Sequence, residues 1–450
     1  MQPPLGGNPP PPHPDPAPDC DPSPRPRPAS SPAAPPSDGE RRARTRSTYR
    51  HELLRAVSSG VLESAGTTFL LTIAVKQLQA GPLAKAMVAG AGSLGLLISP
   101  VVVAQVTAAG WAPSRAASRV LAIGAVAFLL TAILPTLPVF VVGSLIGMAS
   151  SAAIIPLLTH MYQENYPEQE RGRLFSRTVM VRIAAAAVAS KLAGDALDLH
   201  LGRYPWLLLV FALAAGLAAY CLSRCRTGLI PHDGRGHPLR ALRFVREDPL
   251  FRRTLICWML MGFANLMMLP LRVEYLANPA YHPADAAVSV ALIALLTGVV
   301  PNLARLVVSP LWGYLFDHMN FFALRITLNL GFALGILTFF TTPTLSGMVT
   351  GAVIYGISNA GGDVAWSLWV TKFAPAGRVA DYMAVHTFLT GVRGVLAPLA
   401  AFYGIGHLTP VALAVFSSVL IGLATVLLIP ELKFGRRGQA KPALVEEISD

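Results

Sequence analysis

The sequence predicts an all-α integral membrane protein with twelve transmembrane helices arranged as two six-helix bundles. Hydrophobic residues make up 53% of the 450 residues and charged residues only 13%, about half of the usual charged share in soluble proteins. The apolar residues lie in twelve separate stretches, each long enough for a helix to cross a hydrocarbon layer of ~30 Å. Short motifs at equivalent positions in the two halves of the chain support the same fold class, as does an uneven distribution of basic residues.

The twelve stretches divide into two sets of six that carry proline-containing motifs at equivalent positions. The second stretch contains Ser99-Pro100 and the eighth contains Ser309-Pro310, while Pro167 follows the fourth and Pro375 follows the tenth. Two repeats in parallel orientation are typical of secondary transporters, which bind their substrate between the repeats. We place the spans at residues 57–77, 83–106, 117–137, 138–161, 174–196, 204–222, 253–277, 286–312, 322–341, 345–371, 380–403 and 409–430.

The distribution of positive charge predicts the orientation of the chain. The net charge is +12, and about 26 of the 36 Lys and Arg residues lie before the first span, in the loops from even to odd spans, and after the last span. Loops rich in Lys and Arg stay in the cytoplasm, so we expect a multi-pass protein of the cytoplasmic (inner) membrane with both termini cytoplasmic. The positive charge then contacts membrane lipids, and the pattern excludes a nucleic acid as partner.

Outside the spans, composition defines the remaining segments. Residues 1–40 contain about sixteen prolines, so residues 1–50 are predicted to be a disordered, Pro-rich cytoplasmic tail; a ligand for an SH3-like partner is the alternative. Residues 51–222 and 253–430 form the two six-helix bundles. Residues 223–252 are a cytoplasmic linker with a short amphipathic helix near Pro238–Asp248. Residues 431–450 form a second cytoplasmic tail.

Four features together resemble the major facilitator superfamily over residues 57–430: twelve spans, cytoplasmic termini, a long central loop and two parallel halves. That family carries a Gly-x-x-x-Asp-x-x-Gly-Arg-[Lys/Arg] loop after its second and eighth spans. Here the second copy contains Gly313 and Asp317, with Asn320 at the usual Gly position and Arg325 displaced, and the first copy is nearly absent. The resemblance implies that Asp317 faces the start of the fifth span and joins the two halves in one conformation. A solvated acid in a turn is the alternative. The candidates for this latch are Gly313, Asp317, Arg325, Arg305, Arg171 and Arg378.

Ionisable residues within spans are expensive in hydrocarbon, which makes each one a functional candidate. Lys191 lies four residues before Asp195, so a local ion pair explains it. Arg305 is close enough to a helix end to extend toward the membrane surface, and pairing across the interface between the bundles is the alternative. The interiors of spans 3, 6, 9 and 12, which are the outer scaffold in the resembled family, contain no charge. The candidates for substrate binding or coupling are Glu63, Arg182, Asn265, Asp363, His386 and Arg393.

These candidates suggest what the protein carries. Arg182 and Arg393 occupy equivalent spans of the two repeats, and guanidinium groups bind carboxylate or phosphate groups in a bidentate manner. Structural pairing with Glu63 or Asp363 is the alternative. Because a buried carboxyl group gains from neutralisation, Glu63 is our first candidate for a proton carrier and Asp363 the second.

We therefore expect a monomeric secondary active transporter that moves a small-molecule substrate, with an organic anion as the candidate class. It is expected to work by alternating access and to be coupled to H⁺. We expect no cofactor and no metal. The chain contains no phosphate loop for ATP and no hydrolase or metalloprotease motif, so an enzyme is not predicted. The alternative from another class is a membrane sensor or assembly factor that keeps the fold without transporting.

The topology has a direct test. Reporter fusions after residues 112, 235 and 440 should all give a cytoplasmic signal, because each site follows an even number of predicted spans. A periplasmic signal from any of the three fusions would contradict the arrangement.

Overall fold

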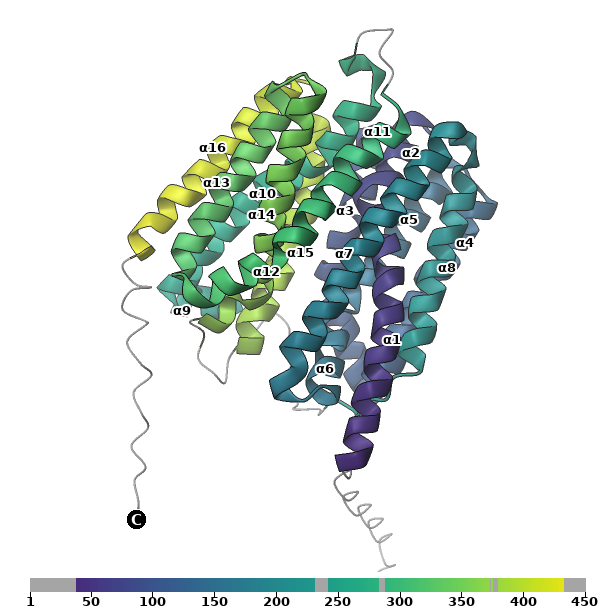
Figure 1. The fold of residues 1–450 in the computed structure, drawn as a ribbon, viewed down its shortest axis with the longest axis vertical. Coiled ribbons are helices and arrows are strands. Elements are labelled where there is room, and N and C mark those ends of the chain that lie inside the picture. The colour runs from purple at the N-terminus through teal and green to yellow at the C-terminus, as the bar shows by residue number, and fades with distance from the viewer. Residues whose placement is uncertain (1–37, 231–241, 283–287, 373, 375–378, 433–450) are drawn as a thin grey trace, which may run out of the picture.

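The computed structural model describes residues 38–230, 242–282, 288–372, 374 and 379–432, and this part of the chain is helical without any strand. Figure 1 shows most helices up to α8 on one side of the molecule and most from α9 onward on the other, with α11 lying beside α2. Helix α1 begins, and helix α16 ends, at the same end of the molecule, which we call the lower end (Figure 1). The opposite end, near α2 and α11, is the upper end.

The N-terminal half contains eight α-helices, and its first span includes a π-helical segment, η1, between α1 and α2. The consecutive segments α1, η1 and α2 together are long and apolar enough for one membrane crossing, and α5 and α6 together for another. The bounds are α1 Asp38–Ser64, η1 Ala65–Phe69, α2 Leu70–Lys76, α3 Pro82–Ala108, α4 Pro113–Ile133, α5 Leu137–Ala153, α6 Ile155–Asn165, α7 Glu168–Leu199, the short η2 Leu201–Arg203 and α8 Tyr204–Ser223.

The C-terminal half has a similar organisation, with a π-helical segment, η5, in its second span. Three of its helices begin after a good N-cap residue. Asp248, Asn320 and Thr409 each accept, through the side chain, a hydrogen bond from a backbone N–H of the first turn. The bounds are α9 Arg243–Glu247, α10 Pro249–Ala277, η4 Pro279–Tyr281, α11 Val290–Ala294, η5 Leu295–Val299, α12 Val300–His318, α13 Phe321–Thr341, α14 Leu345–Leu368, η6 Trp369–Lys372, α15 Val379–Gly404, α16 Pro410–Leu428 and η8 Ile429–Glu431.

In the described part of the chain, ten helical segments are long and apolar enough to cross a membrane. Helix α7 is not among them because it carries many charged residues, and neither is α14, which is rich in glycine. Each of the twelve predicted spans nevertheless coincides with a helix or with a run of consecutive helices. An all-helical membrane protein is therefore the fold that the structure supports, and the crossings of α7 and α14 are part of the proposal below.

The structure differs from the sequence-based expectation at the start of the described chain. Residues 38–50, predicted to belong to a disordered tail, are the first turns of α1. The described part of the predicted linker helix is helical over Arg243–Glu247, and its predicted start lies in residues 231–241, outside the described part. Trp369, which follows α14, is buried against Phe251 and Trp258. The remainder of the Pro-rich tail and residues 433–450 also lie outside the described part.

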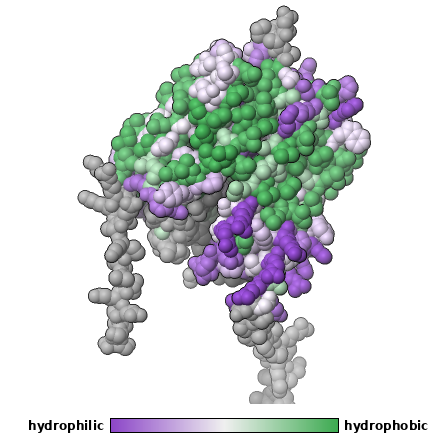
Figure 2. Space-filling view, in the orientation of Figure 1, coloured by the Kyte–Doolittle hydropathy of each residue, from purple (hydrophilic) through white to green (hydrophobic). Residues whose placement is uncertain are grey.

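The surface is apolar around the middle of the molecule. Figure 2 shows hydrophobic residues over most of the visible face, with hydrophilic residues gathered at its lower end, near the start of α1, and along part of its upper edge. Large apolar side chains such as Ile123 on α4, Leu213 on α8 and Val419 on α16 are exposed. An outward-facing apolar surface of this extent is costly in water and suits a lipid environment, in which helices can satisfy their own backbone hydrogen bonds.

Helices α3 and α15 hold the two halves together at close range. A Cβ atom on Gly391 of α15 would lie 2.6 Å from the backbone nitrogen of Leu97 on α3. Gly394, one turn further along α15, would meet Ser93 of α3, and Gly90 faces the carbonyl oxygen of Gly394. Small residues that allow such an approach are typical of helix contacts in membranes.

This contact generates a stability prediction. Gly391→Ala places a methyl group against a backbone that cannot move aside, so we expect it to lower the unfolding free energy by about 1–3 kcal/mol. Gly92→Ala is the matched control, because a Cβ there would meet no atom within 4 Å; we expect its effect to lie within about 0.5 kcal/mol. Thermal unfolding in detergent measures both. Equal melting temperatures for the two variants would show that α3 and α15 are not packed as described.

Candidate functional site

Two π-helical segments face each other between the halves. Segment η1 of the first span and segment η5 of the eighth contact each other, and the hydroxyl groups of Thr68 and Thr297 form a hydrogen bond of 3.0 Å. A π-helical turn inside an α-helix is rare and frequently marks a functional position. Glu63 lies just before η1, and Arg305 lies less than two turns after η5.

Glu63 and Arg305 form the centre of a charged network that joins four helices. The guanidinium of Arg305 on α12 donates to the Glu63 carboxylate on α1 and, through Nε, to Asp363 Oδ2 on α14 at 2.6 Å. Arg182 Nε on α7 lies 3.4 Å from Glu63 Oε2. Asn302 Oδ1 accepts a further bond from Arg305 at 3.3 Å. The network therefore connects α1 and α7 of the N-terminal half with α12 and α14 of the C-terminal half.

The burial of the network is graded. The side chain of Arg305 is 5% exposed and that of Glu63 is 19%, whereas Arg182 and Asp363 are 37% and 38% exposed. Two acids and two arginines make the set neutral, which is the condition under which buried charges are tolerated. Two guanidinium groups contact Glu63, and the contact with Arg182 is the structural pairing that the sequence analysis gave as the alternative to substrate binding. Of the two positions expected for Arg305, the structure shows pairing across the interface between the halves and not extension to the membrane surface.

Other polar contacts join the halves above the network. Lys85 on α3 forms an ion pair of 2.7 Å with Glu274 on α10. Asp198 on α7 accepts a bond of 2.8 Å from the backbone N–H of Val290 at the start of α11. Lys76 donates to the carbonyl oxygen of Val288 at 2.8 Å. Below the network, no hydrogen bond or ion pair between described residues connects the halves, so in this structure the polar contacts close the upper end.

Arg393 and His386 do not join the network. Arg393 on α15 donates to the backbone carbonyl of Trp258 on α10, and His386 is fully buried with its ring 5.2 Å from that of Trp258. Arg325 lies over the face of the same Trp258 at 3.6 Å. The predicted pairing of Arg182 with Arg393 on one substrate is therefore not present, because Arg393 is enclosed within the C-terminal half while Arg182 contacts Glu63.

The latch inferred from the family resemblance is not formed in this structure. Asp317 is exposed and makes no hydrogen bond or ion pair with another described residue. Arg171 instead donates to the backbone carbonyls of Gln163 and Tyr166. Gly313 lies on α12 with open space around it. Arg325, predicted as a latch residue, is buried in the C-terminal half, and Arg378 lies outside the described residues.

The remaining candidate, Asn265 on α10, is partly buried, and its side-chain oxygen has no hydrogen-bond partner among the described residues. Sequence reasoning missed Lys85 and Glu274, which lie near helix ends where charged residues are ordinary. Their pairing joins positions 189 residues apart, and no local pattern could have revealed it. It also missed Glu52, which is fully buried and accepts bonds from Arg55 and Tyr162.

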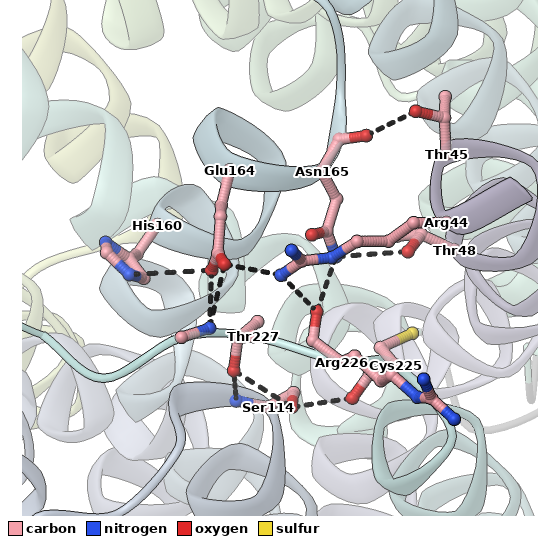
Figure 3. A network of polar contacts seen from close by, with 11 residues as sticks. Arg44, Thr45, Thr48, Ser114, His160, Glu164, Asn165, Cys225, Arg226 and Thr227 are labelled. Carbon is pink, nitrogen blue, oxygen red and sulfur yellow. Dashed lines mark hydrogen bonds and ion pairs between the residues drawn. The ribbon is translucent and has the colours of Figure 1, made fainter. Parts of the chain in front are cut away.

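A second polar network fixes the lower end of the N-terminal half (Figure 3). Glu164 at the end of α6 accepts bonds from Arg44 of α1 and from the backbone N–H of Gly228, which follows α8. Asn165 donates to Thr48 and to the carbonyl oxygen of Arg226, each at 3.0 Å. This network explains why residues 38–50 are helical, and it attaches the start of the linker to the N-terminal half.

Ser114, at the start of α4, extends the same network (Figure 3). Its hydroxyl donates to the carbonyl oxygen of Cys225 at 2.8 Å, and Thr227 lies 3.1 Å away. Burial raises the pKa of the Cys225 thiol to about 12, so the group stays protonated at neutral pH. The unionised thiol packs as a small apolar side chain and is a poor ligand for a metal.

Comparison with known proteins agrees with this fold. Residues 53–398 match the model of the Major Facilitator Superfamily, and no curated protein matches the chain in sequence. Similar solved structures include the nucleoside transporter NupG (D323A mutant), at TM-score 0.68 and 13% identity, over 86% of this chain and 99% of that one. A D-xylose-proton symporter has TM-score 0.60 and 16% identity, over 86% and 96% of the chains. The human organic anion transporter MFSD10 (TETRAN) has TM-score 0.59 and 16% identity, over 88% and 100%.

The central ion pair generates a prediction that a double-mutant cycle checks. Glu63→Gln and Arg305→Gln each leave a buried charge without its partner, so the double variant should lose less stability than the sum of the single variants. We expect a coupling energy of about 1–3 kcal/mol, measured by unfolding in mixed detergent micelles. The matched control is the pair Lys191 and Asp195, which is about half exposed and should couple by less than about 0.5 kcal/mol. Additive losses at Glu63 and Arg305 would contradict the pairing.

Proposed function

The chain belongs to the major facilitator superfamily, and from this premise we propose that it is a secondary active transporter that moves a small organic anion by alternating access, coupled to H⁺. The observation that carries the proposal is the network of Glu63, Arg182, Arg305 and Asp363, which crosses the boundary between the halves. We further propose that all twelve helical segments cross the membrane as six plus six, α7 and α14 included, and that the lower end is cytoplasmic.

The network can divide between the halves at little electrostatic cost. If the halves separate at Glu63, the N-terminal half retains the pair Glu63 and Arg182, and the C-terminal half retains Arg305 and Asp363. Each pair is neutral, so neither half is left with an uncompensated charge in an apolar setting. The contact between Glu63 and Arg305 is then the bond that forms and breaks as access alternates.

An anionic solute between the halves would compete for the same arginines. Its carboxylate or phosphate group would take the place of Glu63 on Arg182 or Arg305, because guanidinium binds such groups with paired N–H donors. The displaced Glu63 carboxylate would lose its counter-charge in a poorly hydrated place and would take up a proton. Solute and proton then enter together, and Asp363 is the second candidate for the proton by the same argument.

Two neighbouring structures support this choice without establishing it. One is described as a proton symporter and another as an organic anion transporter, and both are similar to this chain only at the level of the fold. In the state that closes the lower end, we propose that Asp317 approaches the start of α7 near Arg171. Gly313, which has open space around it, would permit that approach.

A membrane sensor or assembly factor with the same fold is the second candidate function. Flux in reconstituted vesicles distinguishes the two classes, since a sensor would bind a ligand without moving it. The assay uses a panel of organic anions, first ranked by the rise in melting temperature that each produces, because a ligand at 100 times its Kd adds ~2.7 kcal/mol of stability.

The coupling role of Glu63 has its own prediction. Glu63→Gln imitates the protonated carboxyl, so it should abolish accumulation driven by a proton gradient while preserving exchange of substrate between the two sides. Glu52→Gln is the matched control, because Glu52 is also a buried, arginine-paired acid of α1 but contacts only the N-terminal half. Proton-driven uptake in vesicles, normalised to folded protein, measures both variants. If Glu63→Gln accumulates substrate at the wild-type rate, the proton is carried elsewhere.

A further inference from the structure

The interior of the C-terminal half contains a cationic cluster that takes no part in the network between the halves. Its centre is Trp258 of α10. Arg393 of α15 donates to the Trp258 backbone carbonyl, and Arg325 of α13 covers the face of the Trp258 ring at 3.6 Å. The rings of His386 and Trp258 form a T-shaped pair with their centroids 5.2 Å apart. Gly262, one turn after Trp258, leaves the space that the Arg393 guanidinium occupies.

All members of this cluster are buried, and their charges are uncompensated. Arg325 is 1% exposed and Arg393 is 9% exposed. Among the residues that the structure describes, neither arginine forms an ion pair with a carboxylate, whereas Arg305 forms two. Arg325 instead directs Nη2 at the sulfur of Met261, 3.0 Å away, which is a weak acceptor. Two positive charges in an apolar interior without a counter-charge cost several kcal/mol.

The same cluster has more hydrogen-bond donors than acceptors. Trp258 Nε1 and Arg393 Nε have no partner among the described residues, and neither ring nitrogen of His386 has one. Histidine carries at least one N–H in either charge state. The three residues therefore present at least three buried N–H groups that lack an acceptor, and leaving such groups unsatisfied is costly. Water could accept these bonds, but it would not balance the two guanidinium charges.

We propose that a small monovalent anion, of the size of a halide or a carboxylate group, binds at this cluster between α10, α13 and α15. The anion would be held by Arg325 and Arg393, with His386 and the Trp258 indole N–H as further donors. The aromatic rings of Trp258 and Trp369, which are 4% and 0% exposed, surround His386 and limit access of water. The proposal does not depend on the proposed function, because the cluster lies within one half and shares no residue with the network at Glu63.

Thermal unfolding of the purified full-length protein tests the proposal. The protein is prepared in sodium gluconate, whose anion is too large for the cluster, and titrated with sodium bromide, sodium chloride or sodium formate at constant ionic strength. We expect a saturable rise in melting temperature for at least one of these small anions. A response to formate at lower concentration than to halide would identify the carboxylate of an organic solute as the ligand, and the reverse order would identify an inorganic anion.

Matched variants locate the effect. Arg393→Gln and Arg325→Gln should each weaken the apparent affinity at least tenfold. Arg272→Gln is the control, because Arg272 is also a buried arginine of the C-terminal half, stacked on Tyr355 at 3.7 Å, but it belongs to a different part of α10. Glu63→Gln should also retain the response, so failure of transport coupling and failure of this site can be told apart.

A second measurement keeps the test decisive if the arginine variants do not fold. Crystals of the wild-type protein grown or soaked in bromide should show an anomalous peak in contact with Arg325 and Arg393. No saturable stabilisation of the wild-type protein, an equal loss of response in Arg272→Gln, or a bromide-containing crystal without that peak would each overturn the proposal.

Discussion

The position of the Arg305 guanidinium between Glu63 and Asp363 is the interaction on which the rest of this structure depends. A charged group with a 5% exposed side chain is tolerated only with close partners, and here one partner belongs to each half. The packing around it follows from that requirement. The two π-helical segments lie directly above the network, where they bring Thr68 and Thr297 into contact and change the helical register between the upper contacts and the charged layer.

The chain uses its arginines in two ways that differ in their compensation. Arg305 and Arg182 lie beside carboxylates, so their charges are balanced within the protein. Among the described residues, Arg325 and Arg393 have as partners the face of Trp258, a thioether and a backbone carbonyl, which supply partial charges at most. The first arrangement permits movement between neutral states. The second leaves a positive charge that an ion from outside can balance.

The length and apolar composition of the stretches predicted the helices, because each depends on a local run of residues. Each functional candidate could be identified by itself, since an ionisable residue in an apolar run is visible without a structure. The partner of each candidate could not be identified, because Glu63 and Arg305 are 242 positions apart and no local sequence pattern links two such residues. Arg325 was misplaced for a related reason. The loop motif suggested a surface position, but Asn320 begins α13 at Phe321, so Arg325 falls within the helix on its buried side.

The network of Figure 3 has a mechanical consequence for the whole molecule. Because Glu164 and Asn165 hold residues 226 and 228 against the N-terminal half, most of the early linker cannot contribute length when the halves separate. The part of the linker that can extend between the halves, a covalent tether, is therefore the segment from Ile230 to the start of α9 at Arg243. At ~3.3–3.6 Å per residue, this segment spans at most about 45 Å. The tether therefore sets an upper bound on the distance between its two attachment points, whatever energy drives the movement.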